Sequence, residues 1–408
     1  MNDIAKEKRR ALIGLLVCLI ANTSAAGADW VSSALVNISE TFPHVPYSMI
    51  TLVNNIPNLC AVVFTIVAGA LVNRRVSLKA MMLIGIAFHA VGGVMPVFTG
   101  DSSFAVLLLG RFAFGIGYGI MQGLCISMSF KLVTNEALRE HAMGWALTAQ
   151  YITNMIAQVL VGYLCVVRWN YSFLIYAWSF LPFLVVLFLC PRFPIDKADT
   201  TAIGGEQSSL RSESLMTSIR AMPASVWIFS LFTGGYMVFY YPMFLVIGQV
   251  IIGRGLGDPV AVGYAMTFFS VASLAAGVCF GFLARWMKNT ILCFSLFGIA
   301  ISAAGIYFAG SYAMVCLFLA IGGFAATCIL PACNNVYFRQ VPPQRSFLAS
   351  SITLSALNIG AFLGTPYISL IEAFGGEPMT CLLISPVFLV VMGLISIRVM
   401  KKGQRLDA

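Results

Sequence analysis

Charged side chains are scarce in this chain of 408 residues, at 10% of the total, whereas an ordinary soluble domain carries about 25%. Histidine occurs at only three positions, His44, His89 and His141, and neither an H-E-x-x-H nor a C-x-x-C pattern is present. A G-x-x-x-x-G-K-[ST] phosphate loop is also missing from the sequence. These absences exclude a soluble globular fold and ATP drive within the chain. They also leave an intramembrane enzyme without a nucleophile or metal set, so we expect no enzyme and no cofactor.

Long apolar runs fill most of the chain, in which 60% of the residues are hydrophobic. Crossing a bilayer takes roughly 20 mainly apolar residues. Twelve segments meet this requirement, at about 11–38, 47–72, 78–98, 103–131, 142–166, 171–190, 224–252, 259–284, 290–309, 312–337, 346–371 and 378–398. We therefore expect an all-α integral membrane protein with twelve transmembrane helices.

Lysine and arginine orient these segments. If both termini are cytoplasmic, the outer loops hold only Arg168 and Arg254, and the other basic residues between segments lie inside. This asymmetry follows the positive-inside rule for an even number of spans. The net charge of +9 is therefore explained by topology, with a secondary contribution from anionic lipid headgroups, and it requires no nucleic acid partner.

One polar stretch, residues 191–222, interrupts the apolar pattern and is rich in Thr, Gly, Ser and Glu. We expect it to be a flexible cytoplasmic linker between two six-helix halves, residues 1–190 and 223–408. Similar stretches follow the second and eighth segments, which supports an internal duplication. These stretches are Gly69-Ala70-Leu71-Val72-Asn73-Arg74-Arg75 and Gly281-Phe282-Leu283-Ala284-Arg285-Trp286-Met287-Lys288.

Asp29 and Arg111 are the one ionisable pair that we place inside the apolar runs. Ionisable side chains at membrane depth are costly and usually mark a substrate or proton pathway. The first segment runs outward and the fourth inward, so both residues should lie in the outer half of the bilayer, where a direct pair is feasible. Asp29 could carry a proton in alternation with pairing to Arg111, or the two could form a fixed salt bridge between helices. Both roles are open.

The residues around Arg111 resemble the fourth-helix motif of the major facilitator superfamily, L-x-x-x-R-x-x-Q-G-x-G. Here they read Leu107-x-x-x-Arg111-x-x-Phe114-Gly115-x-Gly117. The two duplicated stretches resemble the loop motif of the same superfamily, G-x-L-a-D-r-x-G-r-[RK], and this likeness implies gating loops at Gly69, Asn73, Arg74, Gly281 and Arg285. The resemblance implies the major facilitator fold, with a midplane cavity and alternating access. It is nearest to the twelve-span bacterial drug/proton antiporters, which implies the bacterial plasma (inner) membrane.

Two departures from the family pattern bear on mechanism. Asn73 stands where the loop motif has an acid, so the charge network of the inner gate should be weaker. The fifth segment contains no proline and few glycines between Gly144 and Gln158, unlike the antiporter signature. Antiport is therefore in doubt, and uptake by proton symport stays open.

Polar and aromatic residues within the segments are candidates for lining a solute cavity. Asn22, Ala26, Asp29 and Ser33 should share one helical face, because they recur at i, i+4, i+7 and i+11. Interhelical hydrogen bonds or ordinary packing are the competing explanation. The candidates are Asn22, Tyr118, Gln122, Gln150, Asn154, Gln158, Tyr236, Tyr240, Asn334 and Asn358.

We therefore predict a secondary active transporter that moves a small organic solute, by proton-coupled efflux of an amphipathic drug or metabolite. The alternatives are proton symport of an organic anion or metabolite, and a transport-silent membrane sensor of the same fold. The expected partners are the solute, protons and the lipid bilayer, and the protein is expected to be a monomer.

Overall fold

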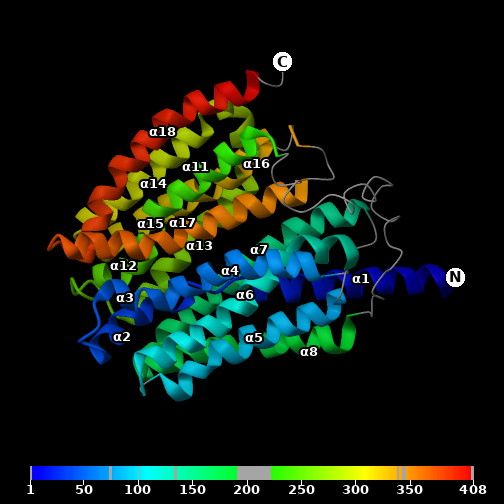
Figure 1. Ribbon diagram of the computed structural model, residues 1–408, viewed down its shortest axis with the longest axis horizontal. Coiled ribbons are helices and arrows are strands. Elements are labelled where there is room, and N and C mark those ends of the chain that lie inside the picture. Colours follow the sequence, from blue (N-terminus) through cyan, green and yellow to red (C-terminus); the bar gives the residue numbers. More distant parts are fainter. Residues whose placement is uncertain are drawn as a thin grey trace. The chain divides into compact units, whose positions relative to one another are not determined.

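The computed structural model describes residues 2–72, 76–100, 102–132, 136–190, 222–337, 340–341 and 346–405, and it is an all-α protein (Figure 1). The helices up to the linker are α1 (Asn2–Asn22), η1 (Thr23–Ala25), η2 (Trp30–Ala34), α2 (Leu35–Thr41), α3 (Tyr47–Ile50), α4 (Leu52–Leu71), α5 (Leu78–Thr99), α6 (Phe104–Leu132), α7 (Glu136–Val167), η3 (Trp169–Ser179) and α8 (Phe180–Leu189). Those after it are α11 (Ala224–Tyr240), α12 (Pro242–Ile251), α13 (Pro259–Met287), η4 (Lys288–Thr290), α14 (Ile291–Phe308), α15 (Tyr312–Thr327), α16 (Ile329–Tyr337), α17 (Ser346–Ala373), η6 (Pro378–Thr380) and α18 (Cys381–Arg405).

The described helices agree with the twelve expected spans. Ten stretches are long and apolar enough to cross a membrane, and one of them, Pro259–Phe308, contains both α13 and α14. The shorter apolar helix Leu52–Ala68 lies within the second expected segment. The prediction of a multi-pass helical membrane fold is confirmed.

Sequence signals explain several helix ends. Ser77 caps α5, because its hydroxyl accepts a hydrogen bond from the Ala80 amide at 3.3 Å. The carboxylate of Asp258 caps α13 by accepting from the Ala261 amide at 2.9 Å. Pro242 begins α12 directly after Tyr241, where α11 has ended. The helix is interrupted at this proline, whose backbone nitrogen cannot donate to the helical hydrogen-bond ladder.

The chain packs into two compact units. The first comprises residues 1–195 and 244–270, and the second comprises residues 196–243 and 271–408. By packing, the segment from Phe244 to Ser270 thus belongs with the first unit, although it follows the linker in sequence. The predicted halves, residues 1–190 and 223–408, are sequence repeats and differ from these packing units. The division into two repeats by the linker 191–222 stays a prediction.

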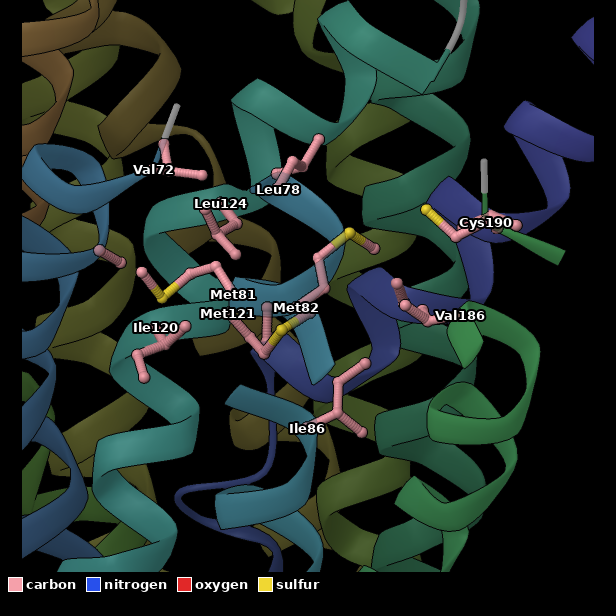
Figure 2. Packing of buried hydrophobic residues seen from close by; sticks show 14 of the residues in the cluster. Val72, Leu78, Met81, Met82, Ile86, Ile120, Met121, Leu124, Val186 and Cys190 are labelled. Carbon is pink, nitrogen blue, oxygen red and sulfur yellow. The ribbon is translucent and has the colours of Figure 1, made fainter. Parts of the chain in front are cut away.

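The core of the first unit is an apolar cluster contributed by α1, α4, α5, α6 and α8 (Figure 2). Methionines fill its centre, and α5 and α8 lie side by side along it (Figure 1). Its labelled members are Val72, Leu78, Met81, Met82, Ile86, Ile120, Met121, Leu124, Val186 and Cys190. Flexible thioether side chains suit such a junction, because they adapt to the irregular space between several helices.

Glycines let α6 approach its neighbours closely. A Cβ on Gly117 would meet the backbone of His89 in α5, and one on Gly119 would meet the Cα of Ala61 in α4. Small residues at such positions allow backbones to pack in direct contact within a membrane. The glycines of α6 therefore hold α4 and α5 against the helix that carries Arg111.

In the second unit α11 packs against α17, and α14 packs against α15 and α18. Ser230 of α11 and Thr353 of α17 share a hydrogen bond of 2.9 Å between buried hydroxyls. Gly234 and Gly360 lie opposite one another at the same contact. These small and hydroxylated residues bring the two helices together without a charged group.

Candidate functional site

The first span is not one helix. Helix α1 ends at Asn22, a short turn of 3₁₀ helix follows, and Ala26 has extended backbone angles (φ −130°, ψ 175°). Gly27 then takes a φ of +107°, which favours glycine. A second 3₁₀ turn precedes α2, which begins at Leu35. The expectation that Asn22, Asp29 and Ser33 share one helical face is therefore wrong, because the chain unwinds between them.

Side chains from three other elements hold the carbonyls of this broken segment, residues 23–34. His89 of α5 contacts the Ala26 oxygen through Nε2 at 3.1 Å. Tyr176 of η3 donates to the Gly27 oxygen at 2.7 Å, and Arg111 of α6 donates from Nη2 to the Ala28 oxygen at 2.9 Å. Unwound backbone at membrane depth is tolerated only where its polar groups find partners. These three donors supply them.

Arg111 is fully buried, with 0% of its surface exposed. Its Nε donates to the Val53 oxygen at 2.6 Å, and Nη1 has no hydrogen-bond acceptor within the described part of the chain. The guanidinium carbon lies 4.4 Å from the ring centre of Phe114, 5.2 Å from that of Tyr176 and 5.8 Å from that of Phe173. Aromatic faces attract a desolvated cation, so the rings compensate for the missing acceptor.

Asp29 stands in the middle of the broken segment, directly before its second 3₁₀ turn, and is partly exposed. Its backbone oxygen accepts a hydrogen bond from the Ser32 hydroxyl at 2.7 Å. Arg111 acts on its carboxylate electrostatically, but no ion pair joins the two side chains among the described residues. In this conformation the pair is thus a through-space interaction, because Arg111 directs its donors to the carbonyls of Ala28 and Val53.

His89 is a third ionisable group at this site, after Arg111 and Asp29, and it is absent from the candidates drawn from the sequence. It is 0% exposed, and Nδ1 lies 2.8 Å from the hydroxyl of Ser179. Its ring centre is 4.4 Å from that of Phe114 and 5.8 Å from that of Tyr176. The signal was available, because a histidine inside an apolar run of membrane length is itself a candidate functional residue.

The amides of the fifth span contact the broken segment. Gln150 donates to the Asn22 oxygen at 3.0 Å, and Asn154 accepts from the indole of Trp30 at 2.6 Å. Gln158 is buried farther along α7. In this conformation Gln150 thus binds the last residue of α1, and Asn154 binds Trp30 within the broken segment. Their role toward a solute stays a prediction.

The second and fourth spans add further polar contacts. Asn54 of α4 donates to the hydroxyl of Ser32 in the broken segment at 2.9 Å. On α6, Gln122 donates to the hydroxyl of Tyr118 at 3.1 Å. Tyr118 and Gln122 therefore form a pair along one face, one turn apart.

In the second unit the predicted residues lie on three helices. Tyr236 and Tyr240 share one face of α11, with ring centres 6.0 Å apart. Asn358 is buried in α17, and Asn334 is partly buried in α16. The structure therefore brings the two tyrosines together, whereas their role toward a solute stays a prediction.

The predicted gating residues fall at helix ends or outside the described residues. Gly69 lies in the last turn of α4, and Asn73 and Arg74 are outside the described ranges. Gly281 lies in α13 and Arg285 in its last turn, where both are exposed. Their role in gating stays a prediction.

Comparisons with known proteins agree with this architecture. The family model described as the Major Facilitator Superfamily matches residues 15–251. The structure of a nucleoside transporter, NupG, in mutant form has a TM-score of 0.70 at 16% identity, over 95% of this chain and 99% of that one. A POT family transporter in complex with 5-aminolevulinic acid has a TM-score of 0.71 at 13% identity, over 96% of each chain. A mutant of the peptide transporter POT in complex with alafosfalin has a TM-score of 0.70 at 13% identity, over 96% of this chain and 95% of that one. At these identities the structural likeness shows the fold.

Proposed function

The chain belongs to the Major Facilitator Superfamily, and on that premise we propose that it is a proton-coupled secondary transporter of a small organic solute. Asp29 carries the coupling proton, and Arg111 sets how readily it does so. The observation that carries this proposal is the placement of Asp29, a partly exposed residue, in an unwound transmembrane segment, with its carboxylate within electrostatic reach of a fully buried guanidinium.

The geometry supports exchange between two arrangements of this pair. Arg111 now uses Nε and Nη2 on backbone carbonyls, and Nη1 has no acceptor among the described residues. A movement of residues 27–29 would bring the deprotonated carboxylate to that unused donor. Protonation of Asp29 would release it. Such a pair couples a proton to a conformational change, because each charge state favours a different arrangement.

The same carbonyls favour a proton over a metal ion as the coupling species. The oxygens of Ala26, Gly27 and Ala28 already contact His89, Tyr176 and Arg111. A sodium ion would have to displace these side chains and approach a buried guanidinium, which repels it. The broken segment is therefore suited to side-chain protonation.

The direction of transport has two candidates. Resemblance to drug/proton antiporters favours efflux of an amphipathic drug or metabolite across the bacterial plasma membrane. We propose that the transporter is a monomer with both termini in the cytoplasm. The proline-free α7 favours symport, since the antiporter signature of the fifth span is missing from its sequence. The solved structures of similar fold include peptide and nucleoside transporters, so small zwitterionic and nucleoside solutes belong among the candidates.

A proteoliposome assay tests the proposal. Internal pH would be followed with a trapped dye while amphipathic cations, dipeptides, nucleosides and organic acids are added in turn, with and without an imposed pH gradient. We expect at least one solute to move protons, and the direction of the pH change separates symport from antiport. Uptake of a solute without any proton movement would contradict the coupling.

A further inference from the structure

The imidazole of His89 uses both of its nitrogens inside the first unit. The Ala26 carbonyl can only accept a hydrogen bond, so Nε2 carries the proton in the contact of 3.1 Å. Nδ1 is then an acceptor, and the Ser179 hydroxyl donates to it at 2.8 Å. In a neutral ring, these two partners therefore assign one tautomer, with the proton on Nε2.

The ring is also fixed by packing. Gly117 of α6 contacts the backbone of His89, which allows α5 and α6 to touch. One side of the ring meets Phe114, whose own ring also faces the guanidinium of Arg111. His89 therefore binds the broken segment through a hydrogen bond. It also packs against Phe114, the ring that contacts Arg111.

We propose that His89 is a positioning residue, which holds the Ala26 carbonyl so that residues 27–29 keep Asp29 within electrostatic reach of Arg111. This inference rests on the proposed function. Ala26 is the last residue before the left-handed turn at Gly27, so the direction of its carbonyl sets where the following residues lie. The Nε2 contact carries the positioning, and packing against Phe114 and α6 keeps the ring in place.

Two substitutions of His89 test the roles of its two ring nitrogens separately. A glutamine amide reaches about as far as Nε2 and can donate to Ala26, whereas the shorter asparagine amide lies near Nδ1 and reaches only Ser179. We expect His89→Gln to retain most of the gradient-driven accumulation per folded protein. We expect His89→Asn to lower gradient-driven accumulation roughly tenfold, because the buried Ala26 carbonyl is left without its hydrogen-bond donor. Ser179→Ala is the matched control, since it removes the Nδ1 partner and leaves Nε2 in place.

Hydrogen–deuterium exchange of the peptide covering residues 22–34 supplies a readout that does not depend on transport. His89→Asn should speed exchange in this peptide, while His89→Gln and Ser179→Ala should match the wild type. The inference is overturned if His89→Asn leaves exchange unchanged, or if glutamine and asparagine reduce accumulation equally at equal exchange. If the wild-type protein moves neither solute nor protons, the proposed function fails, and the exchange pattern still decides whether His89 positions the break.

Discussion

Phe114 lies directly against Arg111, with the guanidinium carbon 4.4 Å from the centre of its ring. The superfamily motif that the surrounding residues resemble has glutamine at this place. An amide would offer the guanidinium a hydrogen-bond acceptor, whereas phenylalanine offers only its π face. Arg111 therefore finds its acceptors in the backbone of the broken first span and in Val53. The buried cation thus contacts both the Phe114 ring and the unwound segment.

Replacing Phe114 with leucine should destabilise the protein by about 2 kcal/mol, because a desolvated cation loses an aromatic face. Thermal unfolding in detergent measures the loss. Phe112→Leu is the control, since Phe112 lies on the same helix but is 46% exposed. Equal losses at the two positions would mean that the contact between Phe114 and Arg111 adds nothing beyond apolar burial.

Asp29→Asn should abolish accumulation driven by a pH gradient while leaving solute exchange in the absence of a gradient. The neutral amide resembles the protonated acid, so the transporter would cycle without carrying a proton. Counterflow and gradient-driven uptake in proteoliposomes measure the two activities. The matched control is Asp258→Asn at the exposed start of α13, where asparagine can still cap the helix. Normal uphill transport by folded Asp29→Asn protein would refute the proton role.

Arg111→Ala should be more damaging than Asp29→Asn, because it leaves the carbonyls of Ala28 and Val53 without donors as well as removing the cation. Each buried acceptor that loses its partner costs about 1–3 kcal/mol. Arg111→Lys should rescue only in part, since a single ammonium group lacks the planar fork that reaches both oxygens. The unfolding temperature measures the loss of stability, and counterflow measures the loss of transport. Full activity of the lysine variant would show that charge alone suffices.

Asn154→Ala should lower the unfolding temperature, because the indole of Trp30 loses its acceptor at a cost of about 1–3 kcal/mol. Ile152→Ala is the control, since Ile152 is exposed on the same helix. Apparent solute affinity measured on equal amounts of folded protein then separates two roles. A changed affinity at unchanged stability would support the cavity role predicted from sequence, and lost stability at unchanged affinity would support packing.

Reporter fusions or cysteine labelling should place residue 205 and the C-terminal tail in the cytoplasm, and residues 101 and 255 outside. The asymmetry of lysine and arginine between the spans gives this expectation. A cytoplasmic signal at 205 together with an external signal at the tail would rule out twelve spans.

The sequence alone determined the membrane fold, because hydrophobicity over about 20 residues is a local property that the bilayer imposes on each segment. It also identified Arg111, because an ionisable residue inside an apolar run can be recognised from residue type alone. The predicted bounds of α5, α13 and α14 lie within a few residues of those observed.

Only the tertiary structure decided that the first span unwinds. Its sequence is apolar enough to continue as a helix, and a single glycine at residue 27 does not break a helix by itself. The break exists because His89, Tyr176 and Arg111 arrive from three distant elements to satisfy the carbonyls that unwinding exposes. A backbone conformation stabilised by donors from elsewhere in the chain has no local signature. The position of Asp29 follows from that conformation, so the sequence could name the residue but not its surroundings.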